Sequence, residues 1–319
     1  MLSTKEKVLQ KLKTNTDFVS GERLAQELQL SRTAIWKAIK ELEKAGYQIE
    51  HHSTGYRYQA SDVLDAAEIA AGIQQPLTIR VLDTSVSTMK DAQMAVLNGE
   101  EPPILVVADM QEAPRGRFNR PFFALEKAGI YMSILLKPDT QLHELPQYTV
   151  LMAVAVAQAI DTLAGVNTQI KWVNDIYLNG KKFVGILSEA MMDVEANSLK
   201  HVIIGMGINF SIPQEKFPAE LQERATSLFA NGEPTITRNQ LIIEIWNRFF
   251  QLLEQKDLNY LSVYREKSFV LGKQVTFQQK SQPFTGKAVG ISDTGELLVD
   301  LDGEITALSS GEISLSSIQ

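Results

Sequence analysis

The chain has 319 residues, 44% hydrophobic and 22% charged, a composition typical of a soluble globular protein with a sizeable core, and this length favours two or three domains. It contains no cysteine, which excludes disulfides, cysteine-zinc sites, iron-sulfur clusters and thioester-forming nucleophiles. The net charge of −7 argues against nucleic-acid binding over the whole surface, but residues 1–60 carry +3 and the remainder −10, so only the N-terminal part is basic.

The opening residues, MLSTKEKVLQ, lack the apolar run of a signal peptide. No stretch of the sequence approaches the roughly 18 consecutive apolar residues of a membrane span. We therefore expect a cytoplasmic protein with no membrane partner.

The N-terminal 60 residues show the pattern of three short helices followed by a β-hairpin. The helices are predicted over residues 5–14, 21–28 and 32–45. Ser20 is expected to cap the second helix and Gly46 to end the third. Residues 47–58 then alternate around a glycine turn, which predicts a two-stranded wing. Residues 1–62 are thus predicted to form a winged helix-turn-helix domain.

The third predicted helix has one apolar and one polar face. The packing face carries Ala34, Ile35, Ala38, Ile39 and Leu42. The outer face carries Ser31, Arg32, Thr33, Trp36, Lys37 and Lys40. A recognition helix presents such N-terminal polar residues to base edges, and its lysines meet phosphates. We therefore predict a DNA-binding surface, with a protein-interaction module as the alternative.

The predicted wing adds basic and aromatic residues near its turn. His51, His52 and Arg57 lie at or close to the tip, where they are expected to reach phosphates. The two histidines are alternatively ordinary surface residues. A metal site is not expected there, because no third ligand is nearby in the sequence.

Residues 66–270 mix strand-like and helix-like segments, which predicts one α/β domain. Strands are expected over 104–108, 130–136 and 203–210, and helices over 150–163 and 236–253. The dipeptide Asn179-Gly180 lies between two apolar runs and strongly predicts a β-hairpin. From residue 271 the pattern changes to short strands, with turns at 293–295 and 302–303, so residues 271–319 are predicted to form a small all-β domain.

Several polar segments of the central domain are candidates for a site. The segment 111–120 carries Arg115, Arg117 and Arg120 around Gly116, so it is suited to binding anions, although an exposed basic loop without a role has the same pattern. Lys171-Trp-Val-Asn-Asp175 precedes the predicted hairpin, and the hairpin's second strand begins with two lysines. Strand alternation predicts that one of these, Lys181 or Lys182, points into a pocket and the other into solvent. Asn209 ends an apolar strand, where it is either a site residue or a simple cap.

Together with Ser87-Thr88-Met89, these segments resemble in order and spacing the bifunctional biotin protein ligases that also repress biotin operons. The resemblance covers the whole chain. It implies an α+β multidomain protein whose parts are a winged helix-turn-helix, a mixed α/β catalytic domain similar to class II aminoacyl-tRNA synthetases and lipoate ligases, and a small C-terminal SH3-like barrel. It also implies an ATP-dependent, AMP-forming ligase that uses biotin, ATP and Mg²⁺.

The resemblance also implies a role for each matched residue. The expected catalytic residues are Lys182, Arg117 and Asp175. The expected biotin-binding residues are Ser87, Thr88, Met89, Gln111, Arg115, Gly116, Arg117 and Lys182. The expected ATP-binding residues are Arg117, Arg120, Asn174, Asp175, Lys182 and Asn209, with no dedicated metal ligands. The sequence departs from the family at Pro114 and Asn119, where glycine is usual, and these changes bear on the mobility of the loop.

The implied reaction forms biotinyl-5′-AMP and transfers biotin to a lysine of the biotin carboxyl carrier domain of acetyl-CoA carboxylase or a related carboxylase. Operator DNA is the other implied partner, bound by Ser31, Arg32, Thr33, Trp36, Lys37, Lys40 and Arg57 in a homodimer that forms when the adenylate is bound. Two alternatives remain at this point, a lipoate protein ligase and a ligand-sensing repressor without turnover.

Overall fold

The computed structural model describes residues 3–138, 145–193, 198–255, 259–279, 282–309 and 311–315. Within these ranges the chain forms two compact units. The first unit comprises residues 1–64 together with Thr237–Asn239, and the second comprises the remainder. Each unit is described by itself.

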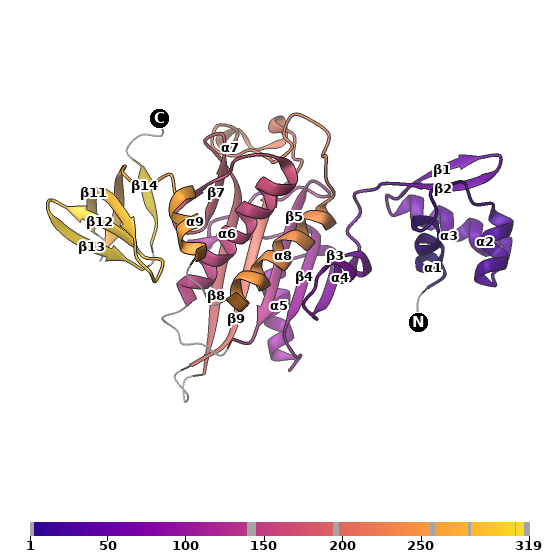
Figure 1. Cartoon of the computed structure of the whole chain (residues 1–319), viewed down its shortest axis with the longest axis horizontal. Helices are drawn as coiled ribbons and strands as arrows, with labels where there is room; N and C mark the ends of the chain where they lie inside the picture. Colours follow the sequence, from indigo (N-terminus) through magenta and orange to yellow (C-terminus); the bar gives the residue numbers. More distant parts are fainter. Residues whose placement is uncertain are drawn as a thin grey trace. The chain divides into compact units, whose positions relative to one another are not determined.

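The first unit is a three-helix domain with a β-wing (Figure 1). Its elements are α1 (Thr4–Lys13), α2 (Gly21–Leu28), α3 (Arg32–Lys44), β1 (Gln48–His52) and β2 (Gly55–Gln59). Ser20 caps α2 by accepting a hydrogen bond from the Arg23 backbone, as predicted. Gly46 follows α3 at φ 100°, a left-handed conformation that favours glycine and ends the helix. The predicted winged helix-turn-helix is confirmed.

The core of this unit is made by the apolar faces of the three helices and the wing. Fully or nearly fully buried side chains are Val8, Leu9, Leu12, Val19, Leu24, Ile35, Ala38, Ile39, Leu42 and Ile49. The prediction for the packing face of α3 therefore holds for all of its members except Ala34, which is only partly buried. Burial of one face leaves the opposite face of α3 in solvent.

The second unit is built on a seven-stranded mixed sheet of order β3-β4-β5-β9-β8-β7-β6. The strands are β3 (Thr78–Ser85), β4 (Ile104–Gln111), β5 (Gly129–Leu136), β6 (Gln169–Lys171), β7 (Asp175–Leu178), β8 (Lys181–Asp193) and β9 (Ser198–Asn209). Only β3 and β4 pair in parallel, and the other pairs are antiparallel. The predicted hairpin is present, with Asn179 at φ 50° and Gly180 at φ 79° in its two-residue turn.

Some elements are longer than predicted, or were not predicted. Strand β4 extends to Gln111 because its end pairs with β3, which the sequence analysis did not identify. Strand β9 begins at Ser198 because it follows the long strand β8. The helices of this unit are α4 (Ala66–Gly72), α5 (Thr88–Leu97), α6 (Leu145–Ala164), α7 (Ala219–Gln222), α8 (Arg238–Gln255) and α9 (Asn259–Lys267).

Helix α6 is, among the described helices, the one that is long and apolar enough to cross a membrane. It contacts strand β8 and helix α9, and its side chains from Tyr148 to Ala157 are buried (Figure 1). A helix that is apolar all round belongs in the interior of a large domain. The burial therefore identifies α6 as a core helix.

The C-terminal strands form a five-stranded antiparallel sheet of order β13-β12-β11-β10-β14. They are β10 (Gln274–Gln279), β11 (Gln282–Ile291), β12 (Leu297–Leu301), β13 (Glu304–Leu308) and β14 (Ile313–Leu315). The turn before β12 rests on the large sheet, where Trp172 Nε1 donates to the Gly295 carbonyl at 3.0 Å. Arg265 of α9 also reaches Asp293 in this turn at 2.7 Å. The C-terminal strands, called the small domain below, are thereby attached to the large sheet and to α9 close to residues 172–175.

Candidate functional site

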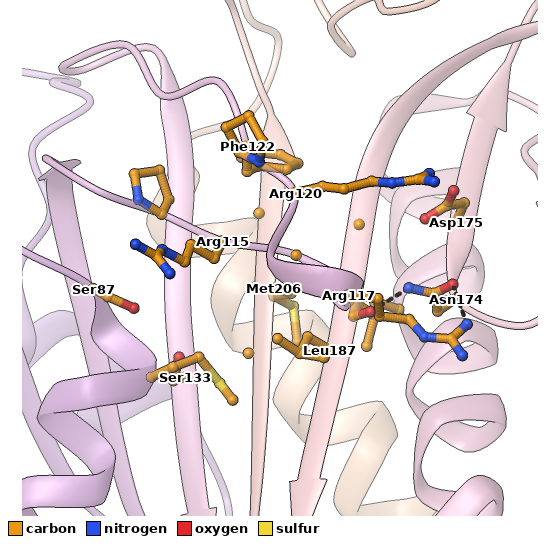
Figure 2. Close-up of a pocket in the computed structure, with 18 of the residues that line it drawn as sticks. Ser87, Arg115, Arg117, Arg120, Phe122, Ser133, Asn174, Asp175, Leu187 and Met206 are labelled. Carbon is orange, nitrogen blue, oxygen red and sulfur yellow. Dashed lines mark hydrogen bonds between the residues drawn. The ribbon is translucent and has the colours of Figure 1, made fainter. Parts of the chain in front are cut away.

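A cavity of about 220 Å³ lies in the second unit, where loop 111–121 meets strands β8 and β9. It is lined by nearly all of the residues that were predicted from the central domain, namely Ser87, Thr88, Met89, Gln111, Arg115, Gly116, Arg117, Arg120, Asn174, Asp175 and Lys182. These residues come from separate stretches of the chain and meet only in the folded sheet. In Figure 2, Arg117, Arg120, Asn174 and Asp175 lie toward one end of the cavity, called the charged end below. Ser87 and Ser133 lie toward the other, called the neutral end, with Arg115 of the loop on the same side of the view.

The neutral end is formed by uncharged polar groups and apolar side chains. Gln111, the last residue of β4, accepts a hydrogen bond from the Thr88 backbone at 2.8 Å. The Thr88 hydroxyl lies 2.8 Å from that of Ser133 on β5. Ser87 is the N-cap residue of α5, yet its side chain makes no capping hydrogen bond. Buried hydroxyls beside apolar walls are suited to a small, largely apolar ligand with a few polar atoms.

Two glycines of β9 make room for the walls of this end. A Cβ atom at Gly205 would lie 2.5 Å from Met89 Sδ, and one at Gly207 would lie 2.5 Å from Phe122 Cε1. Any larger residue at either position would push these side chains from the sheet. The sequence analysis noted the segment 205–209 only for its asparagine and missed both glycines, although glycines spaced by two in an apolar strand signal a close approach.

The charged end is organised around one ion pair. Lys182 Nζ lies 2.6 Å from Asp175 Oδ1, across the β7–β8 hairpin. The register shifts between Ile176 and Tyr177, so that Tyr177 lies opposite Lys182. Asn174 is held by a bond from its Nδ2 to the Ile186 carbonyl at 2.6 Å, which directs its Oδ1 toward Arg117 Nη1 at 3.5 Å (Figure 2). Three charged groups and an amide thus surround one small volume.

Burial affects the cations of this end. The pKa of Arg117 is lowered mainly because its guanidinium is removed from water, and Asp175 and Glu312 oppose the shift. The pKa of Lys171, whose strand neighbour across β6 and β7 is Asp175, is lowered by burial as well. Desolvated cations attract a phosphate more strongly than cations in water. The geometry is therefore suited to binding a polyanion.

The loop that carries the arginines crosses the cavity (Figure 2). Phe118 and Asn119 are left-handed at φ 56° and 63°. Asparagine adopts this conformation more readily than most residues, so Asn119 is compatible with a position where the family has glycine. Arg115 Nη1 donates to Asn119 Oδ1 at 2.7 Å, and the Gly116 amide donates to the Arg120 carbonyl at 2.9 Å. Arg120 itself forms an ion pair with Glu312 of the small domain.

The structure differs from the expected positions of Lys181 and Asn209. Lys182 does point into the cavity, but Lys181 does not simply enter solvent, because its Nζ donates to the Gln222 carbonyl at 2.8 Å. The short helix α7, which was not predicted, supplies that acceptor. Asn209 lies outside the cavity lining and donates to the Thr226 carbonyl at 3.0 Å. Its buried Oδ1 has no hydrogen-bond partner among the described residues.

Further residues line the cavity beyond those predicted. They are Pro114, Phe118, Pro121, Phe122, Ser133, Gly185, Ile186, Leu187, Gly205, Met206, Gly207 and Glu312. Most are apolar or small and carry no signal in the sequence. Glu312 is the charged residue among them, but it lies far along the chain from every other lining residue, so the sequence did not indicate its place in the cavity.

The first unit exposes the predicted DNA-binding face. Ser31, Arg32, Thr33, Trp36, Lys37 and Lys40 are all exposed. Trp36 is 53% exposed, which is unusual for so large an apolar side chain. A groove between the start of α3 and the wing is lined by residues that include Arg32, Thr33, Trp36, His52 and Thr54.

The wing residues are more constrained than the sequence suggested. Arg57 is not free at the tip, because its Nη2 lies 2.6 Å from Glu50 Oε2 on the neighbouring strand. Its guanidinium also lies over the Phe18 ring at 4.6 Å. His51 contacts Glu43 of α3 at 2.6 Å. Of the three wing residues, His52 lies next to the turn itself.

Comparison with known proteins agrees with this division. Residues 81–209 match the biotin/lipoate A/B protein ligase family, residues 4–57 match an HTH domain, and residues 270–316 match a biotin protein ligase C terminal domain. A bifunctional ligase/repressor BirA of Bacillus spizizenii is 38% identical over 99% of this chain and its own full length. The protein of the same name from Escherichia coli is 26% identical over 97% of this chain and 96% of its own.

Solved structures are similar over about three quarters of the chain. A biotin protein ligase from Aquifex aeolicus in complex with biotin and ATP has a TM-score of 0.62 and 27% identity, covering 75% of this chain and 98% of that one. The full-length similarity, the matched domains and the arrangement of the cavity together assign the family. The chain belongs to the biotin protein ligases that carry an N-terminal helix-turn-helix domain, the bifunctional ligase/repressor proteins.

Proposed function

We propose that the cavity binds biotin at its neutral end and ATP at its charged end, and that the chain joins them to biotinyl-5′-AMP. The ligase then transfers biotin to a lysine of a carboxylase carrier domain, and the adenylate-bound form represses transcription. The observation that carries the proposal is the position of the Lys182–Asp175 pair, beside Arg117 and Asn174 and next to the neutral end. A carboxylate bound between the two ends would lie against these cations.

Biotin suits the neutral end by size and polarity. Its sulfur-containing ring and aliphatic chain match the apolar walls made by Met89, Phe122 and Met206. Its polar ring atoms match the hydroxyls of Ser87, Thr88 and Ser133, with Gln111 holding Thr88 in place. We assign Arg115 and Gly116 to closing the loop over the ligand, because they shape the loop through their bonds to Asn119 and Arg120.

The charged end supports attack of the biotin carboxylate on the α-phosphate of ATP. An oxygen of the carboxylate forms the new bond to phosphorus, and pyrophosphate leaves with the electrons of the bond that breaks. Such transfers need positioning and charge neutralisation rather than covalent participation by the protein. We assign Lys182 to the carboxylate and the reacting phosphate, and Arg117 and Arg120 to the other phosphates.

The second step is attack by the carrier lysine on the carbonyl carbon of the adenylate. The amine forms an amide with biotin, AMP leaves, and the amine loses a proton. The carbonyl is held beside Lys182, which stabilises the charge that develops on it. The chain has no cysteine, and none of the described residues that line the cavity is a histidine, so we assign no covalent acyl carrier to the protein.

Magnesium fits the residues that are present. Mg²⁺ is usually bound through one or two carboxylates together with substrate phosphates. Asp175 and Glu312 are the carboxylates in the cavity lining, and Asp175 is the one directly beside Lys182. When bound, the ion would offset the negative charge of the phosphates, and Asp175 would hold it. We keep Asn209 as a proposed ATP contact, but it lies outside the cavity lining, so its buried Oδ1 would have to become accessible before it could accept a hydrogen bond from the nucleotide.

The first unit binds operator DNA through the exposed face of α3. Ser31, Arg32, Thr33 and Trp36 lie toward the start of the helix, where a recognition helix contacts base edges, and Lys37 and Lys40 are placed for phosphates. Arg57 would have to exchange Glu50 for a phosphate to contribute. We expect the cytoplasm to be the site of both activities, since both substrates and DNA are found there.

A direct assay tests the ligase activity. The purified chain is incubated with MgATP, a carboxylase carrier domain and either biotin or lipoate, and the carrier is weighed by intact mass spectrometry. We expect a gain of one biotin, and no gain with lipoate. A gain with lipoate alone would make the chain a lipoate ligase, and biotin binding without any gain would make it a ligand-sensing repressor.

A further inference from the structure

Glu312 brings a carboxylate from the small C-terminal domain into the catalytic cavity. It lies directly before strand β14, which pairs with β10 in the small sheet. Its Oε1 contacts Nη1 of Arg120, and both residues line the cavity. The pair joins residues that are 192 positions apart in the chain.

The small domain has a second attachment, to the large sheet close to Asn174. Trp172, whose indole donates to Gly295, lies two positions before Asn174. The Arg265–Asp293 pair reinforces the same turn. Glu312 is therefore carried by a domain that is attached to the sheet beside the site, rather than by a free tail.

Lys182 and Arg117 are held by neighbours at the start of β7 in the large sheet, whereas Arg120 depends on the small domain. Lys182 is held by Asp175 at 2.6 Å, and Arg117 is half-buried beside Asn174. Arg120, in contrast, has 63% of its side chain exposed, and the Glu312 carboxylate is the main cause that raises its pKa. An exposed arginine side chain can adopt several rotamers, so the position of its guanidinium depends on the group with which it pairs.

We propose that Glu312 is a positioning residue, which holds the Arg120 guanidinium at the edge of the cavity and ties loop 111–121 to the small domain. This extends the proposed function, in which Arg120 contacts the phosphates of ATP. A guanidinium has five donors, so Arg120 can keep Glu312 and also donate to a phosphate. Glu312 thus prepares the loop for ATP rather than competing with it.

The first test measures the loop without ligands. Trypsin cleaves after Arg115 and Arg117 but not after Arg120, because Pro121 follows it. Loop cleavage can therefore be compared among the wild type, Glu312→Gln, Arg120→Gln and the double variant. We expect each single variant to be cleaved faster, by about fivefold or less, which is the size that an exposed ion pair allows. The double variant should be no faster than either, since both changes remove one contact.

The second test measures adenylate formation. We expect Glu312→Gln to raise the KM for MgATP by a similar factor and to leave kcat nearly unchanged. In the Arg120→Gln background the same change should have no effect. Glu312→Asp, which keeps the charge, should be closer to the wild type. Glu304→Gln removes a carboxylate from exposed β13 of the same domain and serves as the matched control.

Three outcomes would overturn the proposal. They are unchanged loop cleavage in Glu312→Gln, additive effects in the double variant, and a lower KM for MgATP, which would make Glu312 a competitor of phosphate. A wild-type chain that formed no adenylate would count against the proposed function instead, and the cleavage test would still decide the role of Glu312.

Discussion

At the scale of single residues, the cavity explains how four basic groups are kept ready for an anion. Three of them are each held by a neighbour at the charged end: Lys182 by Asp175, Arg117 by Asn174, and Arg120 by Glu312. The fourth, Arg115, donates to Asn119 in the same loop. Donors that are already oriented need little rearrangement when charge develops on a substrate. The two adjacent lysines at the start of β8 offer a direct test of this arrangement.

Replacement of Lys182 by alanine should lower the rate of adenylate formation by about 100-fold or more, because loss of one transition-state donor costs roughly 3 to 4 kcal/mol. Lys181→Ala is the matched control, since Lys181 donates to the Gln222 carbonyl outside the cavity. Biotin-dependent release of pyrophosphate measures both. A wild-type rate in Lys182→Ala, or an equal loss in Lys181→Ala, would remove Lys182 from the proposed role.

His201 on β9 should make the stability of the chain depend on pH. It is 8% exposed, its Nδ1 has no partner among the described residues, and burial lowers its pKa from 6.5, with Lys200 and Lys137 adding to the shift and Glu101 opposing it. The unfolded chain therefore binds the proton more readily, so stability is lost as pH falls from 6.5 through the lowered pKa.

Urea unfolding midpoints at pH values above and below 6.5 measure this loss. The variant His201→Gln has no titrating ring, so its midpoint should change less with pH over the same range. The exposed residue His52 of the wing provides the control as His52→Gln. Equal pH dependence in the wild type and His201→Gln would contradict the assignment.

At the scale of elements, α3 separates its two tasks by faces. One face packs into the core of the first unit with Ile35, Ala38, Ile39 and Leu42. The six DNA-binding residues predicted for the other face remain exposed. Changes on the outer face should therefore alter DNA binding without unfolding the domain. Among the residues of this outer face, Lys37 is a simple one to test, because its charge can be removed without changing the packed face.

Lys37→Gln should weaken binding to duplex DNA and reduce the slope of log affinity against log salt concentration by about 1, because one phosphate contact releases about one counterion. A duplex of random sequence is a sufficient probe, since phosphate contacts do not depend on base sequence. Lys5→Gln on α1 is the control. Identical slopes for both variants and the wild type would show that Lys37 does not contact phosphate.

At the scale of the whole molecule, the two units place ligand binding and DNA binding in different parts of the chain. A ligand that orders loop 111–121 can affect DNA binding only through some further change in the molecule. Helix-turn-helix proteins bind paired half-sites as dimers. We therefore propose that the adenylate favours a homodimer, in which two winged helix-turn-helix domains bind one operator.

Sedimentation with biotin and MgATP should show a mass that rises from that of one chain toward that of two, because a ligand that binds the dimer better shifts the equilibrium by mass action. Lys182→Ala should stay monomeric with the same additions, yet dimerise when preformed biotinyl-5′-AMP is supplied. A mass independent of all ligands would refute the coupling.

Local sequence patterns were enough to predict the short helices and turns, and the family resemblance picked out the candidate residues that the fold brings together. Helix caps, apolar spacing and the Asn179-Gly180 turn predicted the winged head and the hairpin, because these depend on neighbours within a few residues. The candidate residues in segments 87–89, 111–120 and 174–182 were predicted through a resemblance in their order and spacing, and these candidates line one cavity.

How these segments meet depends on long-range pairing in the folded chain. The register between β3 and β4 extends β4 to Gln111, and the glycines Gly205 and Gly207 admit Met89 and Phe122 to the floor of the cavity. Attachment of the small domain brings Glu312 to Arg120. Contacts of this kind join residues far apart in the chain, so they depend on strand pairing and domain packing. The spacing of Gly205 and Gly207 signals a close approach, but no short stretch of sequence says which side chain makes it.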